Sequence, residues 1–245
     1  MFENIIKFIA DSNYIDNNKD ILPIPSKLNI PDWLKNLKHT EKKFTAKGCI
    51  PLLDGMTAGY ILKMPTDYYI EHNFDIEGKK RTGASSAIEN TFNFPININR
   101  KGVPEYHTVD QLEGSPLIDK NKNLPIHKIL NPWRIKTPPG YSVLFTPILN
   151  NQDDRFSIIP AIVDTDTFEN EINFPIILNG DKYETLKTTI KRGTPYVQLI
   201  PFKREAWKMK IETINTEEHY KKRFSQYRHI IHNYKNKYWF KKSWK

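Results

Sequence analysis

Five residues in the middle of the sequence have side chains suited to a ligand-binding site. His107 and Gln111 lie in the segment YHTVDQLEGSPL, and Trp133, Arg134 and Tyr141 lie in NPWRIKTPPGYS. An arginine flanked by aromatic rings can hold an anionic ligand by charge and stacking. Turn-rich segments between strands are where rigid scaffolds commonly bind ligands. We therefore predict a concave site lined by these five residues; the alternative is that Trp133 fills a rigid Pro-Pro-Gly corner.

Histidines and carboxylates raise a second hypothesis, a metal site in a jelly-roll enzyme. Non-haem iron requires two histidines and a carboxylate on one face, with open positions for substrate and oxygen. The sequence contains neither His-x-Asp nor His-x-His, and on a strand His107 and Asp110 would point to opposite faces. We therefore predict no metal and no cofactor, and leave the enzymatic alternative open. The residues that could form such a site are His72, His107, His127, Glu71, Asp110, Asp164 and Asp166.

The remaining polar motifs have structural interpretations. Asp164 and Asp166 stand at the end of an apolar segment, where a turn whose carboxylates bind nearby backbone amides is expected. Gly193 is expected to serve a tight turn, and Gln198 an inter-strand or subunit hydrogen bond. Cys49 is the single cysteine, which excludes an intrachain disulfide, and a buried thiol is expected there.

Positive charge is concentrated at the C-terminal end of the chain. Residues 216–245 contain nine lysine and arginine residues against two glutamates, a net charge of +7, so the other 215 residues carry only +2 of the formal +9. Lysine-rich segments with interleaved aromatic rings can bind polyanions nonspecifically, whereas an ordinary solvated helix face would carry the same charges. The predicted polyanion contacts are Lys221, Lys222, Arg223, Arg228, Lys235 and Lys237.

An amphipathic helix is expected in this basic tail. Thr216 can cap it, and Glu217 and Glu218 in its first turn suit the positive end of the helix dipole. Apolar residues then recur at spacings of 4, 3, 4, 3 and 4, which places them on one face. Such a stripe packs on the β body or on a partner, which would be a sister subunit or a virion protein. The stripe consists of Tyr220, Phe224, Tyr227, Ile231, Tyr234 and Tyr238.

The elements that position these residues are predicted to be β-strands. Segments rich in Ile, Val, Tyr, Phe and Thr alternate with turn-forming residues, and Asn179-Gly180 is a strong hairpin signal. No helix of 10–15 residues separates these segments, so we expect an antiparallel jelly roll or β-sandwich with the amphipathic helix at its C-terminal end. The predicted strands are 56–64, 67–74, 141–149, 156–163, 171–178, 184–190, 196–200 and 206–214.

Two parts of different character are expected in the chain. Residues 1–215 are predicted to form the β-rich body, with an irregular first segment at 1–45, and residues 216–245 form the basic aromatic tail. In the last predicted strand of the body, Trp207, Met209 and Ile211 alternate with Lys208, Lys210 and Glu212. This alternation is typical of a strand with one buried face and one wet face.

Long motifs covering most of residues 20–212 carry a family resemblance. They are KGCIPLLDGMTAGYILKMPTDYYI, YHTVDQLEGSPL, NPWRIKTPPGYSVLFTPIL, FSIIPAIVDTDTFENEINFPI and IKRGTPYVQLIPFKREAWKM. With these motifs the sequence resembles an uncharacterised family, a domain of unknown function found in tailed phages, notably marine ones, and in some bacteria. The resemblance implies a phage or phage-like origin and no established reaction. We therefore expect a non-enzymatic binding or assembly protein, with association with the virion as one possible role. The alternative function is a jelly-roll small-molecule enzyme such as a non-haem iron oxygenase.

The expected location follows from what the sequence lacks together with that resemblance. No run approaches the roughly 20 apolar residues of a membrane span. The segment MFENIIKFIADSN has no uninterrupted apolar core of a secretory signal. We expect a protein of the infected host cytoplasm or of the virion that is not secreted and does not contact membranes.

Overall fold

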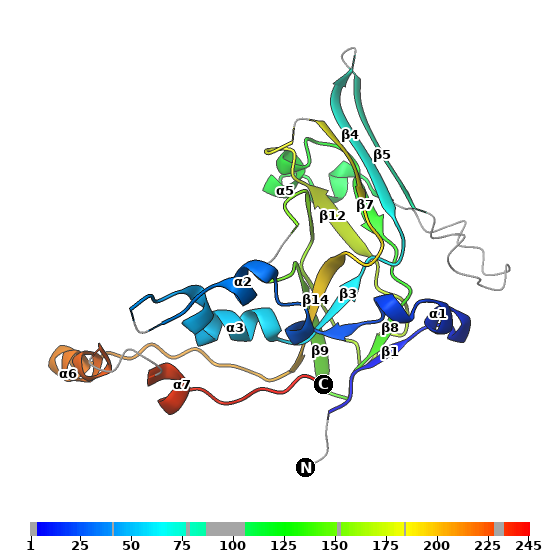
Figure 1. Ribbon diagram of the computed structural model, residues 1–245. Helices are drawn as coiled ribbons and strands as arrows, with labels where there is room; N and C mark the ends of the chain where they lie inside the picture. Colours follow the sequence, from blue (N-terminus) through cyan, green and yellow to red (C-terminus); the bar gives the residue numbers. More distant parts are fainter. Residues whose placement is uncertain are drawn as a thin grey trace.

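Antiparallel β-sheets make up most of the regular structure of the chain. The strand pairs that the structure describes all run antiparallel, and the helices are short (Figure 1). This computed structural model therefore confirms the mainly β class predicted from the sequence. It describes residues 4–40, 42–76, 79–86, 106–150, 153–183, 185–227 and 233–245.

The largest sheet of the described chain has five strands in the order β11-β9-β14-β3-β2. Its central strand, β14, pairs with β9 on one side and with β3 on the other. Residues Tyr196–Leu199 of β14 are all buried, the pattern expected of a strand covered on both faces. The bounds are β2 Ile24–Pro25, β3 Tyr60–Lys63, β9 Tyr141–Thr146, β11 Ala161–Val163 and β14 Pro195–Lys203.

Three smaller sheets complete the β structure, in the orders β10-β12-β7-β6, β13-β4-β5 and β1-β8. The first contains β6 Tyr106–His107, β7 Ile126–Ile129, β10 Phe156–Ile158 and β12 Phe174–Leu178. The second contains β4 Tyr68–Ile76, β5 Lys79–Ser86 and β13 Thr185–Ile190. The third joins β1 Lys7–Ile9 to β8 Arg134–Lys136, which places the start of the chain beside the Trp133 segment.

The helices lie between the strands and in the C-terminal tail. Asp11 caps the first of them by accepting a hydrogen bond from the backbone N–H of Asn13 (2.9 Å). None of the helices in the described part of the chain is long and apolar enough to cross a membrane. The helices are α1 Ser12–Asn17, α2 Asp32–Asn36, α3 Ile50–Thr57, α5 Pro116–Lys120, α6 Thr216–Tyr227 and α7 Asn233–Lys237.

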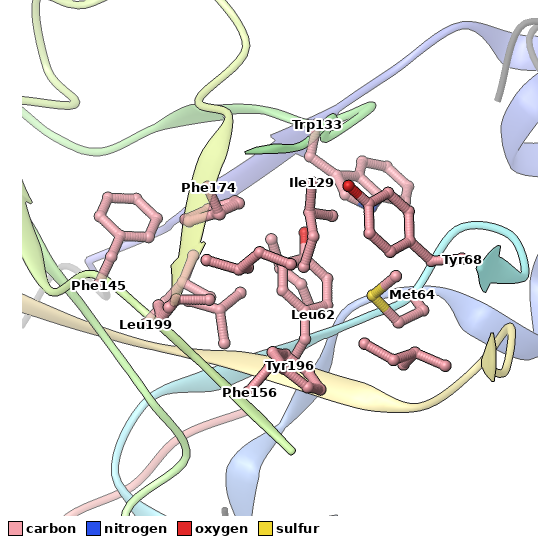
Figure 2. Packing of buried hydrophobic residues seen from close by; sticks show 14 of the residues in the cluster. Leu62, Met64, Tyr68, Ile129, Trp133, Phe145, Phe156, Phe174, Tyr196 and Leu199 are labelled. Atoms are coloured by element: carbon pink, nitrogen blue, oxygen red, sulfur yellow. The ribbon is translucent and has the colours of Figure 1, made fainter. Parts of the chain in front are cut away.

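The larger of two core clusters among the described residues packs between the sheets (Figure 2). Trp133 lies in this core at 3% exposure, and the rings of Tyr14 and Phe8 meet it edge-on at centroid distances of 5.6 and 6.5 Å. Phe174 forms a second aromatic contact, with its centroid 5.5 Å from that of Tyr196. The aromatic and β-branched residues that predict the strands from sequence therefore also fill the interior.

Three local expectations about the body are corrected by the structure. The Asn179-Gly180 turn does not close a hairpin, because β12 pairs with β10 and β7, whereas β13 pairs with β4. Gly180 instead lies against α5, where its N–H donates to the carbonyl of Lys120 (3.0 Å). Helix α3 occupies the beginning of the predicted strand 56–64, and Cys49 just before it is exposed rather than buried.

Gln198 ties the five-stranded sheet to the end of α3. Its side chain is fully buried, its amide group donates to the carbonyls of Gly55 (2.9 Å) and Ala58 (2.7 Å), and its carbonyl accepts from the N–H of Leu149 (2.9 Å). The hydrogen bond expected of Gln198 therefore lies within the chain. Gly193 has φ +85°, the left-handed conformation that the predicted tight turn favours.

Candidate interaction surface on the C-terminal arm

The chain leaves the β body at Arg204, the residue that follows β14. Its backbone N–H donates to the carbonyl of Gly140 (2.8 Å), and its guanidinium binds both carboxylate oxygens of Asp166 at 2.9 and 2.5 Å. The guanidinium also donates to the carbonyl of Tyr141 (3.0 Å) and to the hydroxyl of Ser142 (3.1 Å). We call this set of contacts the Arg204 clamp, because it holds the last body residue against the start of β9.

The carboxylates of the clamp come from the turn after β11. Asp166 accepts a backbone hydrogen bond from Gly140 (2.8 Å), and Asp164 accepts from the hydroxyl of Ser142 (2.6 Å). The guanidinium of Arg204 and the Gly140 N–H hold the pKa of Asp166 well below its usual range. The amide contact of Asp166 agrees with the turn predicted from sequence, and the arginine partner adds an ion pair that the sequence does not reveal.

Beyond the clamp the chain forms an arm that projects from the body (Figure 1), of which the structure describes residues 205–227 and 233–238. The segment 206–214, which the structure describes completely, is not a strand, so the prediction of a strand there is wrong. Its alternating apolar side chains are solvent-exposed: Trp207 by 88%, Met209 by 83% and Ile211 by 85%. The alternation suits pairing with another strand, but nothing in the described part of this chain pairs with it.

Helix α6 continues the arm with further exposed aromatic rings. Its N-terminus is capped by Asn215, whose side-chain oxygen accepts from the N–H of Glu217 (2.9 Å), so Thr216 is not the cap. Tyr220 and Phe224 are 61% and 66% exposed, so the prediction that their stripe packs on the β body is wrong for these two rings.

The rest of the predicted stripe is divided between exposed and undescribed positions. Tyr234 and Tyr238 are also exposed. The side chain of Tyr227 and the whole of Ile231 lie outside the described residues. The stripe therefore offers at least four rings to a partner, and packing on a sister subunit remains a prediction.

The last residues of the chain, 239–245, return to the body and form what we call the C-terminal latch (Figure 1). The indole N–H of Trp239 donates to the carboxylate of Asp54 (2.9 Å), and the ammonium of Lys242 binds the same oxygen (2.6 Å). Asp54 lies on α3 and is 23% exposed in its side chain. One carboxylate on the body thus holds both an aromatic and a basic residue of the tail.

A second pair of contacts completes the C-terminal latch on β3. The rings of Trp244 and Tyr60 meet edge-on, with centroids 6.2 Å apart. The hydroxyl of Tyr60 donates to the backbone carbonyl of Lys245 (3.2 Å). The arm is therefore fixed to the body at both ends, by the Arg204 clamp and by the latch, while its middle exposes apolar side chains.

The basic residues predicted to bind polyanions are distributed along the arm. Lys221 and Lys222 pair with Glu217 (2.8 Å) and Glu218 (2.6 Å) one helical turn earlier, and all four side chains remain largely exposed. Such i,i+4 pairs support the helix weakly. Polyanion binding stays a prediction. Of the other predicted contacts, Arg223, Lys235 and Lys237 are exposed, and Arg228 lies outside the described residues.

The residues of the predicted pocket lie on strands of different sheets and in the segments beside them. His107 and Gln111 come together at the edge of the four-stranded sheet, where the imidazole Nδ1 and the amide oxygen are 2.5 Å apart. Trp133 is buried in the core, at 3% exposure. Arg134 lies on β8, and the hydroxyl of Tyr141 accepts from the side chain of Asn4 (2.7 Å). No hydrogen bond or ion pair among the described residues joins the first pair to the other three.

The metal hypothesis receives no geometric support from the described residues. Among them, no group of three His, Cys, Asp or Glu side chains is placed to hold a metal ion. His127 is buried, and burial lowers its pKa. Asp164 and Asp166 face Arg204. The side chain of His72 lies outside the described residues.

The residues that hold the arm were not predicted from sequence. Arg204 follows a strand in a chain with only eight arginines, which is a usable signal that it has a specific role. Asp54 is the single acidic residue in the apolar stretch IPLLDGM, but no local pattern connects it with Trp239, 185 positions later. Comparison with known proteins adds no relative: no protein-family model matches the sequence, and no curated protein matches it.

Proposed function

We propose that this protein is a non-enzymatic assembly protein of phage type, in which a jelly-roll or sandwich body associates with further copies through its C-terminal arm. The observation that carries the proposal is the exposure of Trp207, Met209 and Ile211 on an arm that is anchored at both ends. Large apolar patches on a folded protein mark interaction sites. The phage resemblance favours the virion or the host cytoplasm as the place of action, with a virion protein as the other partner class.

The apolar surface that the arm exposes to water is large enough for its burial to stabilise an association. Fully burying a side chain such as Ile or Met contributes about 1.5–3 kcal/mol relative to exposure. Burying Trp207, Met209 and Ile211 would therefore contribute on the order of 5–9 kcal/mol per copy. Association costs an estimated 4–15 kcal/mol in lost freedom, so two such surfaces, together with the rings of α6, supply a stabilisation of the required size.

Helix α6 provides a second argument for a partner. It has twelve residues, and helices shorter than about 12–15 residues are only marginally stable in water without tertiary packing. Its exposed rings, Tyr220 and Phe224, are the side chains that would supply such packing. A partner that covers them would stabilise the helix.

Sedimentation velocity of the purified full-length chain at micromolar concentrations tests the proposal. We expect a defined oligomer for the native protein. The triple variant Trp207→Ser, Met209→Ser, Ile211→Ser should sediment as a monomer, because it removes the apolar positions of the alternation. A matched control changes the intervening positions Lys208, Lys210 and Glu212 to serine and should leave the oligomer intact. A native chain that is monomeric throughout this range would contradict the proposal.

Metal analysis of the same preparation tests the alternative of a jelly-roll oxygenase. A non-haem iron enzyme requires a bound iron in each active chain, and the described residues offer it no three-ligand cluster. We expect the assembly to form equally in the presence of a chelator. Stoichiometric iron in a monomeric protein would favour the enzymatic alternative.

A further inference from the structure

We infer that the C-terminal latch of one copy docks on the Asp54–Tyr60 site of a second copy, so that two protomers exchange their arms. The inference rests on the proposed function, because it requires copies of the chain to associate. It adds the identity of the partner and the site at which the partner binds. The starting observation is that the latch is a small, complete interface at the end of a long projecting segment (Figure 1).

Among the described residues, the latch contacts named above join the tail to two elements of the body. Asp54 of α3 accepts from Trp239 and Lys242, and Tyr60 of β3 meets Trp244. A second copy presents an identical α3 and β3. Every one of these contacts can therefore form between chains without any change in geometry, which is the reason that domain exchange is a low-cost route to dimers.

The segment between clamp and latch has the properties of a hinge. Residues 206–214 form no hydrogen bond or ion pair with the body, and in the described chain their single ion pair, Lys210 with Glu212, is internal. The Arg204 clamp fixes where this segment begins. Redirecting the arm to a neighbouring copy therefore breaks no contact of 206–214 with the body.

Exchange of the arms between two copies would also bury apolar side chains that are exposed when the arm folds back on its own body. When the arm folds back on its own body, Trp207, Met209 and Ile211 stay exposed. When two arms cross to opposite bodies they run past each other about a two-fold axis, and the same apolar positions of both chains can meet. A self-complementary contact of this kind is the usual form of a two-fold interface.

Site-directed cross-linking decides between exchange and closure within one chain. In a Cys49→Ser background, one tagged chain carries Asp54→Cys and a differently tagged chain carries Lys242→Cys, the two positions whose side chains touch in the latch. The chains are co-expressed and treated with a short bis-maleimide. Exchange predicts a covalent product that contains both tags. A chain that carries both cysteines should likewise give linked dimers on a denaturing gel.

Two further pairs serve as controls for this experiment. Asp20→Cys with Arg192→Cys, which replaces an ion pair within the body, should give only internal links. Tyr60→Cys with Lys245→Cys repeats the test at the other half of the latch, in case the first pair disturbs folding. Internal links alone in a protein that sediments as an oligomer would overturn exchange and leave the assembly function standing. A monomeric protein would overturn both.

Discussion

Arg204 and Asp166 form a two-point ion pair at the place where the chain leaves its β body. The two nitrogens of the guanidinium lie 2.9 and 2.5 Å from the two carboxylate oxygens, and Gly140 donates a backbone hydrogen bond to the same carboxylate. Bidentate pairs of this kind fix orientation as well as position. The direction in which the C-terminal arm departs is therefore set by the residue after the central strand β14 and by the turn after the edge strand β11.

The clamp predicts a specific dependence of stability on pH. The pKa of Asp166 is lower in the folded protein than in the unfolded chain, where it is about 3.9. The stabilisation by this carboxylate is therefore fully present above about pH 4 and is lost as the pH falls toward its folded pKa. Asp166→Asn removes it at neutral pH. We expect the difference in unfolding free energy between native protein and variant, measured with urea, to shrink as the pH falls below about 4; a difference that stays constant would contradict the clamp.

Replacing Gln198 should destabilise the body strongly. Gln198→Leu leaves three partly buried backbone groups without this partner: the carbonyls of Gly55 and Ala58 and the N–H of Leu149. Each unsatisfied buried group costs about 1–3 kcal/mol. We expect a loss of at least about 2 kcal/mol in urea unfolding, whereas a loss below about 0.5 kcal/mol would show that water replaces the side chain without penalty.

Changing Trp133 to alanine should lower the free energy of unfolding far more than changing His107 to alanine. Trp133→Ala should cost about 3–5 kcal/mol, the usual range for a large buried ring, because Trp133 is enclosed with Phe8 and Tyr14. His107→Ala removes one side-chain hydrogen bond, to Gln111, and should cost about 0.5–1.5 kcal/mol. Thermal or urea unfolding of both variants measures the contrast, and equal losses would contradict the roles assigned to them.

Local sequence patterns predict most of the strands of the body. The segments 67–74 and 184–190 correspond to β4 and β13, because β-branched and aromatic residues bounded by turn formers indicate strands without knowledge of their partners. Helix α3 was missed although Pro51 at its start is a recognised helix signal. The topology of the four sheets could not be predicted, since strand pairing depends on contacts between distant segments.

The arm shows where local patterns mislead. Trp207, Met209 and Ile211 have the alternation of a half-buried strand, yet in the single chain they are exposed. An alternation of apolar and polar residues indicates that a segment can pair with another strand, and that strand need not belong to the same chain. The latch between Asp54 and Trp239 was equally unpredictable, because it joins residues 185 positions apart.

Polyanion binding should depend on the lysines of the arm rather than on those of the body. Lys235→Gln with Lys237→Gln should lower the salt concentration at which the protein elutes from heparin, because each lost phosphate contact reduces the salt dependence of binding. The matched control, Lys27→Gln with Lys42→Gln, removes two exposed charges from the body. Equal shifts for the two variants would place the basic surface elsewhere.

Amide hydrogen exchange of residues 205–214 tests the central claim, that the arm is an association surface, most directly. In the single chain these amides form no hydrogen bond among the described residues, so they should exchange at the rate of an unstructured peptide in dilute solution. As the protein concentration rises and copies associate, we expect their exchange to slow. In the Trp207→Ser, Met209→Ser, Ile211→Ser variant it should stay fast at every concentration. Fast exchange of this segment in the native protein at every concentration would contradict the account.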